Sequence, residues 1–253
     1  MQPKEIPASD AYPPTPIAPG REPYIAIIGD LVQSRKLGAA DRRRVQKDLA
    51  HLLERFNQRF AASIQAPFGI ALGDEFEGLM RTEDAHLFLP EMIWQCERAI
   101  PVPPVRIGIG YGAIDTDLEG PAAHLDGPAF HRARAAIELA KKEKRLGGVF
   151  EGFGGTHDAI LNGVARLMRY QRASWSKQQR AVVHFLRELI DQQNVAAHVL
   201  DLSKQAVSAY ALDAGWDAYK EGEEALRLAI REACGQPAPW AEAQTGQQEP
   251  ASR

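Results

Sequence analysis

Three carboxylates stand next to apolar runs, at positions where a fold could bring them together. Asp30 closes the run YIAIIGD, and Asp74 and Glu75 follow Gly73 in IALGDEFEGLM. Two carboxylates and a backbone carbonyl, such as that of Leu31, could hold one or two Mg²⁺ or Mn²⁺ ions, because these cations prefer oxygen ligands. Magnesium bound in this way is often shared with substrate phosphates. The residue types therefore indicate a metal-dependent phosphate or nucleotide site.

The segment that follows Asp30 supplies groups that bind phosphate. It reads LVQSRKLGAADRRR and leads into the start of an expected helix. Backbone N–H groups and the positive end of a helix dipole favour phosphate at such a place. The candidate nucleotide- or phosphate-binding residues are Leu31, Ser34, Arg35, Lys36 and Gly73.

Each of these acidic residues also has an ordinary structural interpretation. Gly-Asp is a common turn pair, so Asp74 could serve only the turn of a hairpin. Asp30 could simply end a strand. Glu77, after the turn, is expected to face solvent, and Asp115 and Asp117 are expected to be solvated loop residues. The two aspartates together, in this order along one topology, favour a site.

Apolar periodicity predicts the elements that must position these groups. The expected elements are a strand at 24–30, a helix at 42–60, a hairpin at 67–80, a helix at 82–98, a strand at 105–114, a helix at 128–145 and a strand at 148–153. Asp41 and Thr82 are the expected N-caps, and Pro90 is expected to kink or split its helix. The first six elements follow the ferredoxin-like order β-α-β-β-α-β, with an antiparallel sheet and both helices on one face. The first strand is then central, and the hairpin turn can bring Asp74 to Asp30.

Residues 193–210, QNVAAHVLDLSKQAVSAY, have the pattern of a helix-turn-helix. Ala197 is small enough to let a second helix approach, and Asp201 is a residue type that tolerates the left-handed turn position. Ser203 caps the second helix, and Val207 packs back on the first. In a DNA-binding version the start of the second helix enters the major groove, where Gln suits adenine. The candidate DNA-contacting residues are Ser203, Lys204, Gln205 and Ser208.

Charge supports DNA binding less clearly than the motif does. Residues 174–233 carry 7 Lys/Arg against 9 Asp/Glu, which is the wrong balance for binding driven by phosphate contacts. Residues 132–180 carry 11 Lys/Arg against 4 Asp/Glu and could supply the missing positive field. The alternative is a helical bundle used for dimerisation or for packing as a lid.

Composition fits a globular chain and leaves several function classes open. The 253 residues are 45% hydrophobic and 25% charged, with a net charge of −3 that gives no sign of a nucleic-acid partner. Two cysteines argue against a disulfide framework. No signal peptide and no apolar run of roughly 20 residues is recognised, so we expect a cytoplasmic protein without a membrane partner. The expected organisation is a disordered arm (1–22), a palm domain (23–155), a connecting helix (156–174), a helix-turn-helix domain (175–234) and a disordered tail (235–253).

Four motifs resemble the palm domain of class III nucleotidyl cyclases and diguanylate cyclases. They are IIGDLVQS, LGDEFEGL, VRIGIGYG and LDGPAFHRARAA, in that order within residues 24–150, and GDEF matches four of five residues of the diguanylate cyclase signature. The resemblance implies Asp30 and Asp74 as ligands of Mg (or Mn), Glu75 as a supporting acid, and a nucleotide of the ATP or GTP class as ligand. The whole arrangement, with the second block, resembles the SatD family of bacterial proteins.

The chain departs from the cyclase pattern where the family reads the base and stabilises the transition state. The family's helix offers an Asn and an Arg, whereas the matching positions here are His131 and Ala135. Arg134 lies one residue away, about 100° round a helix. Ile70 stands near the place of the adenine-selecting Lys, and Leu72 replaces the first Gly of the signature. His131 and Arg134 are therefore the candidate catalytic residues of a rebuilt site.

The sequence thus predicts an α+β fold, a ferredoxin-like palm followed by an all-α helix-turn-helix domain. The first functional hypothesis is a dimeric transcriptional regulator in which a nucleotide bound with Mg²⁺ biases DNA binding. The second is an active nucleotidyl cyclase or nucleotidyltransferase, in which a ribose 3′-hydroxyl attacks the α-phosphate of a nucleoside triphosphate. The third is a scaffold with a degenerate palm and no ligand.

Overall fold

The fold is taken from a computed structural model that describes residues 21–189 and 191–236. The two ends expected to be disordered, 1–22 and 235–253, lie outside this range except for four residues at its edges. Within the described residues, no helix combines the length and the apolar character needed to cross a membrane.

The described chain is α+β, and its first part alternates strands and helices in the expected order. The strands are β1 (Tyr24–Leu31), β2 (Ile64–Leu72), β3 (Glu75–Met80), β4 (Val105–Gly112) and β5 (Gly147–Glu151). The α-helices are α1 (Ala39–Arg59), α2 (Ala85–Ala99), α3 (Pro128–Lys142), α4 (Gly155–Ser174), α5 (Lys177–Glu188), α6 (Gln193–Leu200), α7 (Lys204–Asp213) and α8 (Trp216–Ala233). Two short 3₁₀ turns are η1 (Ser34–Lys36) and η2 (Ala122–His124).

The five strands form one sheet in the order β2-β3-β1-β4-β5. Strand β1 is antiparallel to both β3 and β4, and β2 is antiparallel to β3. Strand β5 pairs parallel with β4, so the sheet as a whole is mixed. The sequence pattern predicted the strand over 148–153 but not this pairing. Because β1 is central, its last residues lie between the start of β3 and the start of β4.

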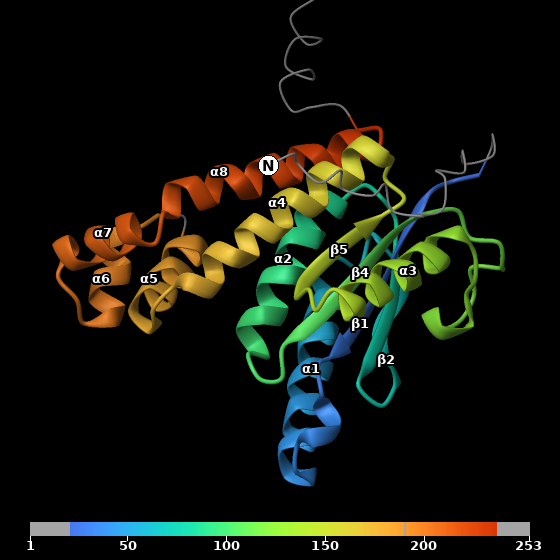
Figure 1. Cartoon of the computed structure of the whole chain (residues 1–253), viewed down its shortest axis with the longest axis horizontal. Coiled ribbons are helices and arrows are strands. Elements are labelled where there is room, and N and C mark those ends of the chain that lie inside the picture. Colours follow the sequence, from blue (N-terminus) through green and yellow to red (C-terminus); the bar gives the residue numbers. More distant parts are fainter. Residues whose placement is uncertain (1–20, 190, 237–253) are drawn as a thin grey trace, which may run out of the picture.

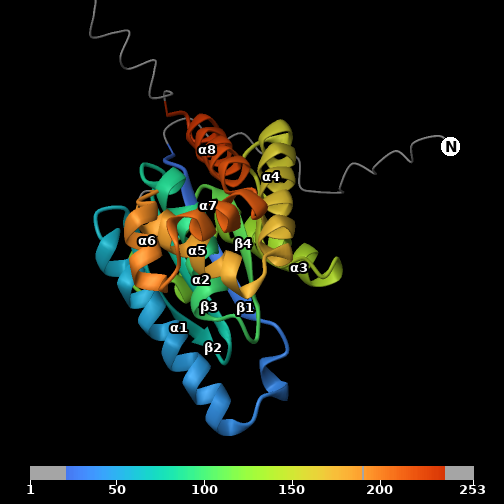
Figure 2. The same ribbon diagram turned by 90° about the vertical axis from the view of Figure 1, so that its left-hand side faces the viewer.

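The two faces of the sheet are covered by different helices. Ile25 and Ile27 pack into the buried cluster that contains side chains of α1 and α2. Ala26 and Ile28 pack into a second cluster with side chains of α3. Since successive residues of a strand point to opposite faces, Asp30 lies on the same face as α3. Figure 2 places α1 and α3 on opposite sides of the sheet.

The backbone of α3 lies directly against the backbone of β4. This close packing is possible because the side of β4 that faces α3 carries three glycines, Gly108, Gly110 and Gly112. A Cβ atom on Gly110 would lie 2.1 Å from the carbonyl oxygen of Ala129 and 2.2 Å from the nitrogen of Ala133. The Gly-Ile-Gly pattern therefore seats α3 directly on the strand. This close seating fixes where the side chains of α3 meet the sheet.

The C-terminal helices extend away from the sheet (Figure 1). Helices α4 and α8 run antiparallel: Gln171 donates to the carbonyls of Ala214 and Gly215 at one end, and His157 lies 3.8 Å from Glu232 at the other. Helices α5, α6 and α7 cluster at the end of this pair farthest from the sheet. One continuous buried cluster joins the α1–α2 side of the sheet to side chains of α4, α5, α7 and α8.

Several helix starts differ from the sequence expectations. Helix α1 begins after Gly38, so Asp41 lies in its first turn and is not the cap. Helix α2 begins after Asp84 instead of Thr82. Pro90 lies inside a single helix α2, which is therefore not split. Burial of Pro90 and its neighbours in the core offsets the lost backbone hydrogen bond, so tertiary packing overrides the local preference.

Candidate functional site

An acidic patch, made of Asp30, Glu75 and Glu77, lies on the α3 face of the sheet. Asp30 pairs directly across the strands with Glu75 on β3 and with Arg106 on β4. Glu77 lies two residues along β3 from Glu75 and therefore on the same face. The central position of β1 thus gathers three carboxylates and one arginine at one end of the sheet.

Arg134 of α3 holds two members of the acidic patch. Its guanidinium donates to Glu75 Oε1 at 2.6 Å and to Glu77 Oε1 at 2.7 Å. Burial lowers the pKa of Arg134, but the bonds to the two glutamates outweigh burial and raise it. Glu77 is only 7% exposed, so the expectation that it faces solvent is wrong. The reason is the two-residue period of β3, which turns Glu77 under α3.

Asp30 is the least satisfied member of the patch. Its carboxylate Oδ2 lies 3.6 Å from Arg106, and its side chain is 16% exposed. Its Oδ1 is buried and has no hydrogen-bond partner among the described residues. Burial raises the pKa of Asp30, while Arg106 and Lys141 act against this and Asp74 and Glu75 add to it. Oδ1 of Asp30 is therefore left without a partner in the described chain, and burial disfavours the ionised form of this carboxyl group.

Asp74 lies in the β2–β3 turn and faces the segment that follows β1. The buried Ser34 hydroxyl, at the start of η1, donates to the Asp74 carboxylate. Gln46 of α1 donates to the carbonyl of Gly73 at 2.8 Å, and Gly73 has a φ of 66°, which suits glycine. The turn is thus tied to η1 and α1, close enough for Asp74 to influence the pKa of Asp30.

A cavity of about 330 Å³ opens between this turn and the start of α1. Its lining residues are Ser34, Arg35, Arg42, Gln46, Gly73, Asp74 and Glu75. Arg42 donates to the carbonyl of Arg35 at 3.0 Å, which directs it along the cavity wall. Lys36 is exposed beside the cavity, and the side chain of Leu31 is buried in the core. Two arginines beside two carboxylates suit a phosphate that brings its own cation.

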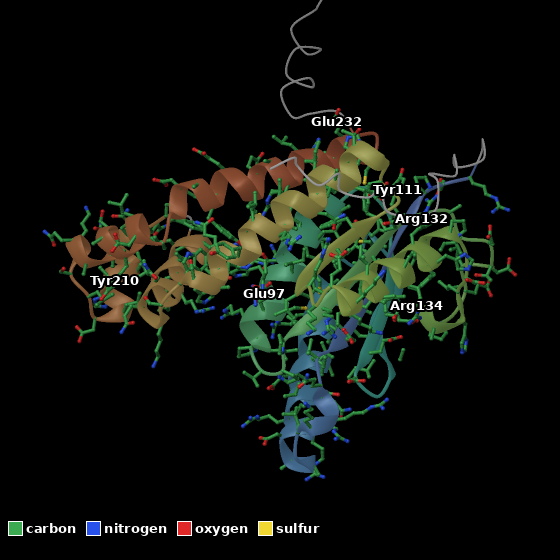
Figure 3. The ribbon with its side chains drawn as sticks, viewed as in Figure 1. Glu97, Tyr111, Arg132, Arg134, Tyr210 and Glu232 are labelled. Atoms are coloured by element: carbon green, nitrogen blue, oxygen red, sulfur yellow. The ribbon has the colours of Figure 1, made fainter. Side chains whose placement is uncertain are left out.

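His131 does not join the acidic patch. Its Nε2 lies 2.9 Å from Asp126 in the loop before α3, and its side chain is more than half exposed. Arg132, one residue further along α3, is buried and donates to the carbonyl of Tyr111. Figure 3 shows Arg132 beside Tyr111, with Arg134 on another part of α3. Of the two candidate catalytic residues, the fold therefore brings only Arg134 to the carboxylates.

Sequence reasoning missed four residues around this site. Arg106, Arg42, Gln46 and Lys141 contact it or act on its charge. A signal existed for Arg106, which is the one charged residue within VRIGIGYG. The others depend on how helices dock on the sheet.

Few carboxylates at this place are free to bind a cation. In the ranges 21–189 and 191–236 no group of three or more His, Cys, Asp and Glu side chains is suited to hold a metal. Glu75 is engaged by Arg134, which leaves Asp30 and Asp74 as the available carboxylates. The free Oδ1 of Asp30 is a hard oxygen, the kind of ligand that magnesium would accept.

Helices α6 and α7 meet at a tight turn. Asp201 occupies the left-handed region, with φ 52° and ψ 47°. The Ser203 hydroxyl accepts a hydrogen bond from the backbone N–H of Ala206 at 3.1 Å and so caps α7. Ala197 and Val207 are buried between the helices. These local features agree with the sequence expectations for the segment.

The first turns of α7 present polar side chains to solvent. Ser203, Lys204, Gln205 and Ser208 are all exposed. Apart from the capping bond of Ser203, the described part of the chain offers these four side chains no partner. They form the polar surface of α7 that a ligand or nucleic acid could contact.

The family comparison covers both of these sites. A family model matches residues 24–214, from β1 to the end of α7, and its description is the SatD family. The chain belongs to the SatD family. Among curated proteins, no relative of this SatD chain is found. The matched range includes both the acidic patch and the polar surface of α7.

Replacing Asp30 with asparagine is expected to stabilise this SatD protein at neutral pH. The folded-state pKa of Asp30 is raised, so its ionised form weakens folding above that pKa and the protonated form does not. The stabilisation should shrink as the pH falls through the folded-state pKa. Thermal unfolding between about pH 7 and pH 4 measures this. Asp48→Asn, on the exposed side of α1, is the control, and an unfolding temperature of Asp30→Asn below that of the wild type at pH 7 would contradict the expectation.

Proposed function

We propose that this SatD protein is a transcriptional regulator, in which a cyclase-like sheet domain binds a nucleotide with Mg²⁺ and biases DNA binding by a helix-turn-helix. The observation that carries the proposal is the α6–α7 geometry, with a left-handed Asp201 and a capped α7. Apart from the Ser203 cap, the polar side chains at the start of α7 have no partner among the described residues. Helix-turn-helix readers place this part of the second helix in the major groove.

The exposed residues of α7 match the chemistry of base and phosphate contacts. Gln205 can form two hydrogen bonds to adenine, and Lys204 can contact guanine or phosphate. The exposed cations of the neighbouring helix α5 are Lys177 and Arg180, whereas Arg187 is paired with Glu91 and Glu223. A modest basic surface of this kind predicts weak, salt-sensitive binding unless base contacts or a second copy add to it.

The strand order supports a cyclase-like, ferredoxin-like palm as the nucleotide-binding part. Strands β1 to β4 are antiparallel in the order β2-β3-β1-β4, with α1 and α2 on one face. In this proposal Ser34, Arg35 and Arg42 bind the phosphates of an ATP- or GTP-class nucleotide. Asp30 and Asp74 would hold Mg²⁺, which neutralises phosphate charge when bound.

An active nucleotidyl cyclase or nucleotidyltransferase is the second candidate, favoured by the free Oδ1 of Asp30. Arg134 could stabilise charge on a transferring phosphate only by releasing Glu75 and Glu77, and His131 is paired with Asp126 outside the patch. Incubation with each nucleoside triphosphate and Mg²⁺ or Mn²⁺, followed by mass spectrometry, distinguishes the two. A product that Asp30→Ala does not form would establish the enzyme.

Alanine at both Lys204 and Gln205 is expected to abolish sequence-specific DNA binding. Selection from a randomised duplex pool should enrich a site for the wild type, and the double variant should bind that site at least about tenfold more weakly, since each lost base contact is worth about 1–3 kcal/mol. Lys47→Ala, at an exposed lysine of α1, is the control. Failure of the folded wild type to enrich any sequence would overturn the DNA-binding proposal.

A homodimer through α4 completes the proposal. Ile160, Leu167 and Tyr170 lie along one side of α4 and are 45%, 71% and 79% exposed. In an antiparallel pair of α4 helices about a two-fold axis, Leu167 of one copy would oppose Gly163 of the other, and Ile160 would oppose Tyr170. Large side chains would thus meet small or complementary ones, as an isologous interface requires.

Leu167→Glu is expected to convert the dimer to a monomer, because each interface would bury two unpaired carboxylates. Light scattering coupled to size-exclusion chromatography measures the mass. Leu212→Glu is the matched control, since Leu212 is 79% exposed on α7 and is not part of the proposed α4 interface. A wild type that is monomeric at all concentrations, or a dimer that survives Leu167→Glu, would contradict the α4 interface.

A further inference from the structure

A second cavity, of about 320 Å³, lies where the sheet domain meets the C-terminal helices. Its walls come from α2 and the segment after it on one side, and from α4 and α5 on the other. The lining residues are Trp94, Glu97, Arg98, Pro101, Arg172, Trp175, Arg180, Ala181 and His184. Figure 3 shows Glu97 between the sheet and the α4–α8 pair, at this junction. The cavity is separate from the acidic patch, with which it shares no residue.

Two buried nitrogen atoms of the lining residues have no partner. The indole Nε1 of Trp94 has no acceptor among the described residues, although Trp94 is only 6% exposed. The Nδ1 of His184 is also buried and makes no hydrogen bond in that part of the chain. Buried polar atoms are almost always hydrogen-bonded, so these two nitrogen atoms mark a junction whose hydrogen bonding is incomplete. Both nitrogens are shielded from the cavity by neighbouring atoms, so the side chains would have to move before a bound molecule could reach them.

The charges around the cavity favour an anion. Arg98 and Arg180 line it, while Arg172 is neutralised by a two-pronged ion pair with Glu97. Burial lowers the pKa of His184, and the nearby Arg98 lowers it further. Glu188 is the acidic group closest to His184, with 4.0 Å between its Oε1 and the imidazole Nδ1. Arg98 donates to Gln95 and Arg180 donates to the carbonyl of Ala173, but neither arginine forms an ion pair within the described residues. Two cations without a counter-charge therefore line this space.

We infer that this cavity binds a small planar organic anion. Its ring would pack against the indoles of Trp94 and Trp175, whose centroids lie 6.3 Å apart, and its carboxylate or phosphate would lie between Arg98 and Arg180. The volume is at the small end of ligand-binding pockets, which selects a one- or two-ring molecule.

The position of the cavity gives such a ligand a structural consequence. Trp94 and Arg98 belong to α2, which packs on the sheet, whereas Arg180 and His184 belong to α5, which packs on α6 and α7. A bound anion would therefore bridge the sheet domain and the helix-turn-helix segment. This inference goes beyond the proposed function, because it needs neither nucleotide nor DNA binding.

Three one-ring probes of equal size but different charge test the inference. They are benzoate, benzyl alcohol and benzamidine, titrated into the full chain labelled with ¹⁵N, with the indole N–H signals as the readout. The Trp94 signal is assigned from Trp94→Phe. Benzoate is expected to shift this signal with a Kd of about 10 mM or tighter, and benzamidine to leave it unchanged.

A double variant, Arg98→Ala with Arg180→Ala, identifies the charge contacts. It is expected to weaken benzoate binding at least about tenfold, which is 1.4 kcal/mol, while Arg166→Ala on α4 leaves it unchanged. Circular dichroism checks that the variants are folded. No shift of the Trp94 signal with benzoate, an equal shift with benzamidine, or an unchanged Kd in the double variant would overturn the inference.

Discussion

Gly110→Ala is expected to lower the free energy of unfolding by at least about 3 kcal/mol, or to prevent folding. The new methyl group would lie 2.1 Å from the oxygen of Ala129 and 2.2 Å from the nitrogen of Ala133. Both are backbone atoms of α3, so no side-chain movement can relieve the contact. Helix α3 would have to move off the sheet, and Arg134 would move with it, away from Glu75 and Glu77.

Gly69→Ala is the matched control for this prediction. Gly69 lies on β2 of the same sheet, and a Cβ there meets nothing within 4 Å. Its effect should be within about 0.5 kcal/mol, as for exposed substitutions in general. Urea unfolding followed by circular dichroism measures both variants. If Gly110→Ala and Gly69→Ala unfold at the same urea concentration, the direct seating of α3 on β4 is wrong.

Glu97→Leu is expected to destabilise the protein by about 3–5 kcal/mol, because it leaves a buried guanidinium without its counter-charge. Arg172 donates to both carboxylate oxygens of Glu97 at 2.8 Å and also to the hydroxyl of Tyr219. Arg169 lies 3.2 Å from the same carboxylate. Since Glu97 is on α2 and Arg172 on α4, this ion pair joins the sheet domain to the C-terminal helices.

A second substitution distinguishes the contribution of the Glu97–Arg172 ion pair from the cost of leaving Arg172 buried without a counter-charge. Adding Arg172→Met to Glu97→Leu should restore most of the lost stability, because an apolar pair of similar volume can replace a buried ion pair. Glu138→Leu is the surface control: its ion pair with Lys141 is exposed, so the change should be within about 1 kcal/mol. A double variant less stable than Glu97→Leu alone would contradict the account of this junction.

Local signals in the sequence predicted much of the fold. The run from Tyr24 to Asp30, the Gly73-Asp74 turn and the Gly-rich strand at 105–112 gave the correct element order, because period and turn chemistry act over a few residues. The α6–α7 turn followed from Asp201 and Ser203 in the same way. Helix starts shifted by a few residues, as in α2, and packing in the core kept Pro90 inside a single helix.

The chemistry of the site depends on contacts between segments that are far apart in the sequence. Local sequence patterns do not predict such contacts. Local pattern predicts that Glu77 faces solvent, whereas the register of β3 and the seating of α3 place it under Arg134. His131 was expected at the site, but the rotation of α3 turns it to Asp126. Pairing of β5 with β4 and the junction at Glu97 likewise involve residues far apart in the chain. The DNA-contacting, metal-binding and phosphate-binding assignments remain predictions.

The most direct test of the proposed regulator measures DNA affinity with and without nucleotide. Fluorescence anisotropy of the duplex enriched by selection gives the Kd of the wild type, with Mg²⁺ alone and with Mg²⁺ and ATP or GTP. At least one nucleotide is expected to change this Kd by about fivefold or more, the usual size of coupling between sites, and Asp30→Ala should bind the duplex but lose the response. An equal Kd in every condition, with nucleotide binding verified separately, would contradict the coupling of the sheet domain to the helix-turn-helix.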